Sequence, residues 1–176
     1  GLLTAVFDAY NRKTFPQRLM KTGETPPLFT DETYTVWTQK TSAERVWKAL
    51  ERKLKKEACN MLMRVWLSEL AGSDELLFRY ICKTFDTKHD ISLNFGDADV
   101  LEVGKIARKV GHEALYLKQF VRFQKAADDL FFAPVRPIYN ALPLTIDHFT
   151  GRFADQPWVI YDLRRRYGYY YDLQTA

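Results

Sequence analysis

The chain has 176 residues, of which 47% are hydrophobic, 15% aromatic and 27% charged. This composition supplies a sizeable core and excludes a disordered protein. The formal net charge of +4 permits binding to nucleic acid but is smaller than a dedicated nucleic-acid coat protein would carry. The apolar run over residues 2–7 is far shorter than the roughly 20 residues that cross a bilayer, so we expect a cytoplasmic protein without membrane contact.

The first two thirds of the chain predict mainly helices. Residues 2–11 fit a short helix, and after a proline-containing loop the β-branched and aromatic residues 34–38 predict a strand. Apolar residues then recur at helical spacing over residues 43–54, where Thr41 and Glu44 fit a capping box at the helix start. Further helices are expected over residues 61–71, 73–85 and 100–117.

The last third favours strands. Residues 120–137 contain two β-rich runs around a polar turn at 126–129, which predicts a hairpin. Residues 140–153 predict a helix with Pro143 near its first turn, and residues 158–173 predict two aromatic strands that turn near 165–168. We therefore expect an α+β fold in one domain over residues 1–176, helical over about 1–117 and built from antiparallel β-hairpins over about 118–176.

Metal and redox chemistry find little support in the sequence. Cys59 and Cys82 lie in helical segments without partners at metal-ligand spacing, so we expect reduced core residues and no iron–sulfur site. The segment "GHEALY" begins like a zinc-protease helix, but Tyr116 stands where a second histidine is needed. We therefore predict no metal and no cofactor, and we expect Glu113 at a helix end or in an ion pair with Arg122 or Lys118.

The segment "TIDHFTGRF" contains the candidate acid–base residues. A histidine that a carboxylate orients can act as a general acid or base, which makes His148 a candidate with Asp147 or Glu113 as its partner. Residues adjacent in sequence point to different sides of a helix, so Asp147 does not orient His148 by adjacency alone. The alternative is a histidine half buried between Phe149 and the sheet.

The segment "YDLRRRYGYYYDL" is the most distinctive surface signal. Arginine pairs with phosphates through two N–H groups, and tyrosine rings offer flat faces on which unpaired bases stack. Because alternate strand residues share a face, Tyr167, Tyr169 and Tyr171 should line one side, with Arg166 and Tyr170 on the other. The alternative is a hairpin whose rings only cover the sheet. The predicted nucleic-acid-binding residues are Arg122, Arg152, Arg164, Arg165, Arg166, Tyr167 and Tyr169.

Five separated blocks of the chain resemble a known family. They are "GLLTAVFDAYNRK", "ERVWKALERKL", "FVRFQ", "APVRPIYNALPLTIDHFTGRF" and "WVIYDLRR". The family is one of DNA metabolism proteins with a domain of unknown function. Its members occur beside a radical-SAM protein of DNA repair, and some are fused to a uracil-DNA glycosylase. The resemblance marks as site candidates Arg122, Pro137, Asn140, Pro143, His148, Phe149, Arg152, Phe153, Asp162 and Arg164.

The sequence leaves three functions open. The first is an accessory protein of DNA metabolism that binds nucleic acid, DNA in particular, and works with a radical-SAM or glycosylase partner. The second is an enzyme that acts on a base or nucleotide with His148 as its acid–base group. The third is a protein-interaction module whose aromatic surface docks a partner and does not touch nucleic acid.

Overall fold

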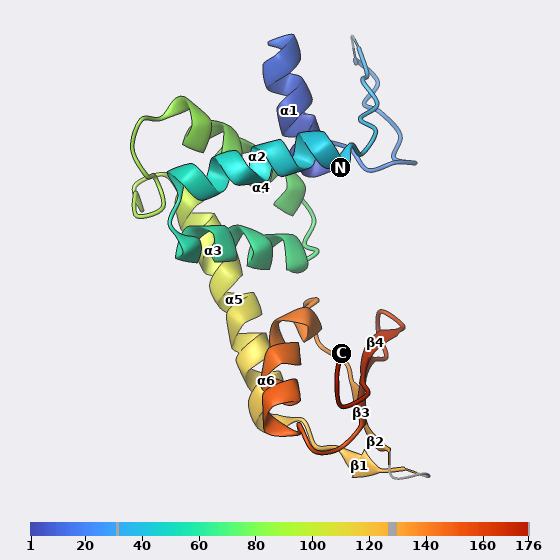
Figure 1. Cartoon of the computed structure of the whole chain (residues 1–176). Helices are drawn as coiled ribbons and strands as arrows, with labels where there is room; N and C mark the ends of the chain where they lie inside the picture. Colours follow the sequence, from blue (N-terminus) through green and yellow to red (C-terminus); the bar gives the residue numbers. More distant parts are fainter. Residues whose placement is uncertain (31, 127–129, 176) are drawn as a thin grey trace. The chain divides into compact units, whose positions relative to one another are not determined.

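The computed structural model describes residues 1–30, 32–126 and 130–175 of the chain (Figure 1). Its helices precede a four-stranded sheet, which confirms the predicted α+β class. The chain forms two compact units: the first contains Gly1–Trp66 and Leu70–Gly104, and the second contains Leu67–Glu69 and Lys105–Ala176. The boundary between the units falls inside one long helix, α5 (Ala98–Phe120).

The first unit is built from amphipathic helices that each bury one face. Their fully buried side chains include Val6, Leu50, Val65, Tyr80 and Val103. Such a stripe of apolar residues is what drives a short helix to pack, since isolated helices of this length are marginal in water. Besides the start of α5, the helices are α1 (Leu2–Arg12), α2 (Lys40–Lys53), α3 (Lys56–Leu67) and α4 (Ser73–Asp86).

The strand predicted over residues 34–38 is wrong. These residues run without regular secondary structure, and Trp37 is 78% exposed. β-branched and aromatic residues form a strand only where a neighbouring strand accepts their backbone hydrogen bonds, and the described part of the first unit contains no strand.

Two helix starts also differ from the prediction. Helix α2 begins at Lys40 with Gln39 as its N-cap, so Thr41 lies inside the helix and the capping box is wrong. The backbone N–H of Gln39 donates instead to the hydroxyl of Thr4, 3.2 Å away, so a contact with α1 fixes where α2 begins. Helix α3 (Lys56–Leu67) begins and ends earlier than predicted. It cannot continue through Glu69, which adopts a left-handed conformation (φ 53°).

Both cysteines are free, as predicted. Cys59 is buried, and Cys82 is half-buried on α4. Burial raises the pKa of the Cys82 thiol to about 11, so it remains a neutral thiol at physiological pH. Within residues 1–30, 32–126 and 130–175, no helix combines the length and the apolar character that crossing a membrane requires.

The second unit consists of a mixed sheet and the helices that pack on it. Both predicted hairpins are confirmed, because β1 pairs with β2 and β3 pairs with β4 in antiparallel fashion. The strands β2 and β3 are parallel, so the sheet is mixed and the expectation of a wholly antiparallel sheet is wrong. The turn predicted at residues 126–129 includes 127–129, which lie outside the described residues. The strands are β1 (Gln124–Lys125), β2 (Phe131–Val135), β3 (Trp158–Asp162) and β4 (Tyr167–Tyr171).

The parallel pair follows from the segment that joins the hairpins. Two parallel strands need a crossover that returns the chain to the starting end of the sheet, and a helix usually provides it. Here the crossover contains the short 3-10 helix η2 (Leu142–Thr145) and then α6 (Ile146–Arg152). Pro143 lies in the first turn of η2, where a missing N–H costs little, which confirms its predicted place.

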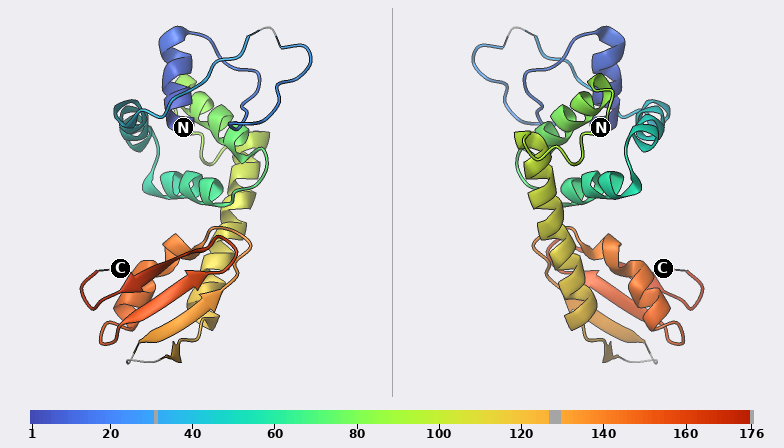
Figure 2. Two further views of the ribbon diagram at one scale, coloured as in Figure 1. Left: turned by 90° about the vertical axis from the view of Figure 1, so that its right-hand side faces the viewer. Right: turned by 90° about the vertical axis from the view of Figure 1, so that its left-hand side faces the viewer.

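The helices cover one face of the sheet and leave the other open. Figure 2 shows α5 and α6 behind the sheet in its left view and in front of it in its right view. On the covered face, Trp158 is fully buried and its ring lies 6.2 Å from that of Phe149 on α6. Phe123 completes this aromatic core with its ring 5.7 Å from Trp158 and 5.1 Å from Phe153.

Candidate nucleic-acid interface

The turn between β3 and β4 is organised by one buried carboxylate. Asp162 is fully buried, and its Oδ1 accepts the backbone N–H groups of Arg164 at 2.8 Å and Arg165 at 3.1 Å. The backbone N–H of Arg166 donates to the carbonyl of Asp162 at 2.8 Å, and Arg166 adopts a left-handed conformation with φ 59°. An aspartate that bonds the backbone two and three residues ahead is a common way to fix a tight turn. The turn spans residues 163–166, slightly earlier than predicted.

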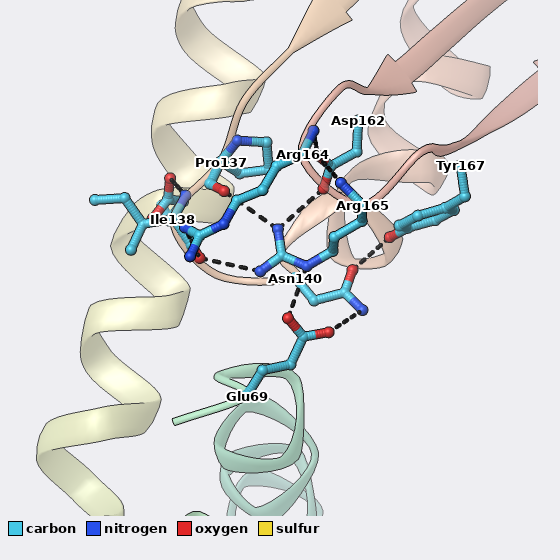
Figure 3. A network of polar contacts seen from close by, with 9 residues as sticks. Glu69, Pro137, Ile138, Asn140, Asp162, Arg164, Arg165 and Tyr167 are labelled. Atoms are coloured by element: carbon cyan, nitrogen blue, oxygen red, sulfur yellow. Dashed lines mark hydrogen bonds and ion pairs between the residues drawn. The ribbon is translucent and has the colours of Figure 1, made fainter. Parts of the chain in front are cut away.

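Arg165 ties this turn to three other segments of the second unit (Figure 3). Its guanidinium donates to the carboxylates of Asp162 at 3.0 Å and Glu69 at 2.8 Å. It also donates to the carbonyl oxygens of Pro137 at 3.2 Å and Ile138 at 3.0 Å. The side chain of Arg165 is only 12% exposed. Arg165 therefore serves the protein's own structure, and its predicted contact with nucleic acid does not fit this placement.

The charge of Arg165 is secured by its neighbours. Burial lowers the pKa of its guanidinium, but the hydrogen bonds that it donates to the carboxylates of Asp162 and Glu69 outweigh burial and leave the pKa raised. Arg165 thus remains a cation at every physiological pH, so its ion pair with Asp162 is not lost through deprotonation of the guanidinium.

The loop that follows β2 is held by the same network. The amide of Asn140 donates to Glu69 at 3.2 Å, and its carbonyl oxygen accepts the hydroxyl hydrogen of Tyr167. Burial first, and then the neighbouring Tyr169 and Asp162, raise the pKa of Tyr167 to about 12. The hydroxyl of Tyr167 is therefore neutral and already donates a hydrogen bond within the protein. The residue as a whole is half-buried.

The remaining candidate arginines are exposed and fall into two pairs. Arg164 and Arg166 project from the β3–β4 turn, although one guanidinium nitrogen of Arg164 donates to the carbonyl of Ile138 at 3.1 Å. Arg122 and Arg152 lie at the opposite end of β3. Their sequence neighbours pack together there, since the rings of residues 123 and 153 lie 5.1 Å apart. A five-residue strand separates the pairs by roughly 15 Å.

The tyrosines of β4 alternate between the two faces of the sheet, as predicted. Tyr167 and Tyr169 share a face, with ring centroids 6.0 Å apart. Tyr171 lies on that same face, where its buried ring stacks on Trp158 at 5.4 Å. Tyr170 points to the open face and is 57% exposed. The ring that solvent reaches most freely is therefore Tyr170, whereas the predicted stacking residues Tyr167 and Tyr169 lie on the helix-covered side.

The predicted acid–base residues do not form a pair. Glu113 accepts the backbone N–H of Ile138 at 2.8 Å, so it is a structural partner of the loop after β2. The Nε2 atom of His148 is buried and has no hydrogen-bond partner among the described residues, so this atom meets neither Glu113 nor Asp147. Asp147 is exposed on α6. In the described ranges, no group of three or more His, Cys, Asp or Glu is placed to hold a metal ion.

One hollow of the first unit has none of the predicted site residues in its lining. It has a volume of about 310 Å³ and is lined by α4 and residues 15–19. Two of its basic side chains are paired with carboxylates: Arg79 with Asp99 at 2.8 Å, and Lys83 with Asp97 at 2.7 Å. Arg18 is a third basic residue of the lining, and Glu75 and Asp86 add two carboxylates, so the charged side chains of the hollow are of both signs.

The sequence analysis did not identify two residues of the second unit, Glu69 and Tyr161. Glu69 lies 96 residues before Arg165, and nothing local in the sequence indicates that they meet. Tyr161 lies on the open face of the sheet, opposite Gly168 in the register. Strand alternation could have indicated this placement, since Tyr161 is one residue from Ile160 and three from Trp158, which are both buried on the other face.

The second unit is thus an α+β unit with a sheet covered on one face and exposed arginines near both ends of β3. Residues 71–176 match the family DUF4130, described as a domain of unknown function. The match covers more than half of the chain, and the chain belongs to this family. Comparison with curated proteins and with solved structures gives no match.

Proposed function

We propose that this protein is a nucleic-acid-binding accessory protein of DNA metabolism. The observation that carries the proposal is the β3–β4 turn, which Asp162 and Arg165 hold from within while Arg164 and Arg166 face solvent. Cations on a fixed turn lose less conformational freedom on binding than cations on a flexible loop. Arginine is also the side chain best suited to pair with phosphate through two N–H groups.

The distribution of charge supports the second unit as the binding part. This unit contains eleven Lys and Arg against eight Asp and Glu, so it accounts for +3 of the net charge of +4. Asp162 is fully buried, and its charge is offset by Arg165 in an ion pair of 3.0 Å. The net charge of +3 therefore lies on the remaining residues of the second unit, outside this buried pair.

The proposed partner comes from the family resemblance. The chain would work with a radical-SAM protein of DNA repair or with a uracil-DNA glycosylase, since the resembled family occurs beside the one and fused to the other. An accessory role also fits the placement of His148, whose buried Nε2 lacks a carboxylate partner among the described residues.

The test is fluorescence anisotropy with labelled single- and double-stranded DNA and RNA over a salt series. Binding through phosphates should weaken steeply as salt increases. Changing Arg164 and Arg166 to Ala should reduce the slope of log affinity against log salt by roughly 1.5, the value for two lost phosphate contacts. Lys48 and Arg52, exposed on α2, provide a matched double alanine control that should leave the slope unchanged. No binding at low salt, or an unchanged slope in the turn variant, would contradict the proposal.

A second candidate function is docking of a partner protein through α5. Leu115, Tyr116 and Phe120 are each more than half exposed there, and the rings of Tyr116 and Phe120 lie 4.7 Å apart. Clustered exposed apolar residues often mark protein interfaces. This function predicts that Tyr116→Ser with Phe120→Ser abolishes binding of a purified partner, measured by calorimetry, without changing any affinity for nucleic acid.

A further inference from the structure

The open face of the sheet carries aromatic side chains in an ordered array. The strand register aligns Phe132, Val159 and Tyr170 across β2, β3 and β4 in one row. The next row contains Pro134, Tyr161 and Gly168. Neighbouring strands lie about 4.8 Å apart, so the rings of Phe132 and Tyr170 are separated by roughly 10 Å, with Tyr161 in the adjacent row between them.

Tyr161 occupies an unusual position in this array. A Cβ atom built on Gly168 would lie 2.9 Å from the ring atom Cδ2 of Tyr161 and 2.4 Å from the carbonyl oxygen of Ile160. The ring therefore takes the space that a side chain at residue 168 would fill, and it lies across the strand rather than standing upright from it. Covering a strand glycine with a cross-strand aromatic ring is a known stabilising arrangement. Tyr161 is half-buried, so part of its side chain remains accessible to solvent.

The aromatic side chains of the open face are accessible to solvent and lie near exposed cations, as a binding surface requires. Tyr170 is 57% exposed, and Phe132 and Tyr161 are half-buried, so all three rings can be reached. Arg136 follows β2 directly and is exposed, and the arginine-bearing β3–β4 turn lies at this same end of the sheet. Asp172, the acidic residue after β4, directs its carboxylate to the backbone N–H groups of residues 174 and 175 at 2.9 and 2.7 Å.

We propose that this face binds the unpaired bases of single-stranded DNA. We name it the aromatic platform and define it as Phe132, Tyr161 and Tyr170. Its rings would stack bases, and the basic side chains at the end of the sheet, Arg136 among them, would contact phosphates. The proposal rests on the proposed nucleic-acid-binding function and specifies its ligand.

Single-stranded DNA fits the aromatic platform better than duplex does. In a duplex the base faces are covered by one another, so a flat surface of rings reaches only the backbone. Reading a duplex groove instead requires a protruding helix or β-ribbon. A sheet with exposed rings is a common solution for unpaired bases, which splay out and stack on aromatic side chains. An apolar protein partner explains the rings but not the adjacent cations.

The experiment compares a labelled 20-nucleotide oligothymidine with a duplex and an RNA strand of the same length, using the full chain at about 150 mM salt. The wild-type chain should bind the DNA single strand at least about 10-fold more tightly than the duplex. Tyr170→Leu, which removes the ring but keeps a strand-compatible side chain, should weaken single-strand binding by about 5- to 150-fold, the range for one lost stacking contact. Tyr170→Phe, which keeps the ring, should bind like the wild type.

Tyr116→Leu is the matched control, because Tyr116 is also an exposed tyrosine of the second unit, 61% exposed on α5. It should leave affinity unchanged. Circular dichroism spectra that match the wild type establish that each variant is folded.

The outcomes separate this proposal from the one on which it rests. Salt-dependent binding that Tyr170→Leu leaves intact overturns the aromatic platform but retains the proposed function. Tighter binding to duplex or to RNA also overturns the platform as a site for single-stranded DNA. No binding to any nucleic acid overturns both proposals. A loss of affinity in Tyr170→Leu with an unchanged salt slope supports the platform, because stacking releases no counterions.

Discussion

Changing Arg165 to Met removes the cation at the centre of the β3–β4 turn while keeping a long side chain of similar shape. The change leaves the fully buried carboxylate of Asp162 without its ion-pair partner. It also removes the donors to Glu69 and to the carbonyl oxygen of Pro137. We therefore expect Arg165→Met to destabilise the second unit strongly, whatever its effect on ligand binding.

The magnitude follows from the burial of each partner. Removing one member of a buried ion pair typically costs about 3–5 kcal/mol, because the remaining charge is left uncompensated. Asp162 keeps two backbone N–H bonds, so we place the cost near the lower limit, at about 3 kcal/mol. The contact with Glu69 adds less than about 1 kcal/mol, since that side chain is 49% exposed and water screens it.

Hydrogen exchange read by mass spectrometry measures this effect locally, on peptides that contain β3 and β4. A loss of about 3 kcal/mol should accelerate exchange of their protected amides by roughly 100-fold where exchange follows opening of the second unit. Arg164→Met is the matched control, since its guanidinium makes one hydrogen bond to Ile138 and is otherwise exposed. An Arg165→Met effect smaller than about 1 kcal/mol, or equal to that of the control, would refute the reasoning.

Two further predictions concern backbone space and pH. Gly168→Ala should lower the melting temperature, because its Cβ would meet a carbonyl oxygen of β3 at 2.4 Å. Gly151→Ala should raise the melting temperature, because Gly151 lies on α6 with nothing within 4 Å of an added Cβ. A lower melting temperature for Gly151→Ala, or an unchanged one for Gly168→Ala, would contradict this reasoning. In the first unit, the side chain of Lys83 donates to Asp97 at 2.7 Å and lowers the pKa of that carboxyl. Asp97 therefore contributes stability above its unfolded-state pKa of about 4, and this contribution is lost as pH falls further. Thermal unfolding followed by circular dichroism between about pH 5 and pH 2.5 should show the loss, and Asp97→Asn should flatten the dependence; an equally steep dependence in that variant would contradict it.

Helical periodicity predicted the helices of the first unit well because it is a local property of the chain. The predicted helix over residues 73–85 corresponds to α4, and that over residues 100–117 lies within α5. Strand propensity failed at residues 34–38, since a strand also depends on a neighbour that local sequence does not specify. The same limit applies to the parallel pairing of β2 with β3, which links residues more than twenty positions apart.

The candidate site was predictable to the extent that strand alternation governs it. The alternation of Tyr169 and Tyr170 followed directly from the two-residue period of a strand. Which face the helices cover does not follow from alternation, and the predicted stacking residues Tyr167 and Tyr169 lie on the covered face. Arg165 looked equivalent to Arg164 and Arg166 in the sequence, and only the distant Glu69 and the buried Asp162 distinguish it.

The second unit is discontinuous in sequence, because it includes the three residues Leu67–Glu69. A fragment that starts at residue 105 would carry Arg165 and Asn140 but not the carboxylate that both of them contact. The family match, which begins at residue 71, also starts just after this segment. A truncation study of the second unit therefore has to restore Glu69, for example through a fused peptide. Otherwise, a weakened fragment would wrongly suggest that the whole helical unit is needed for the sheet to fold.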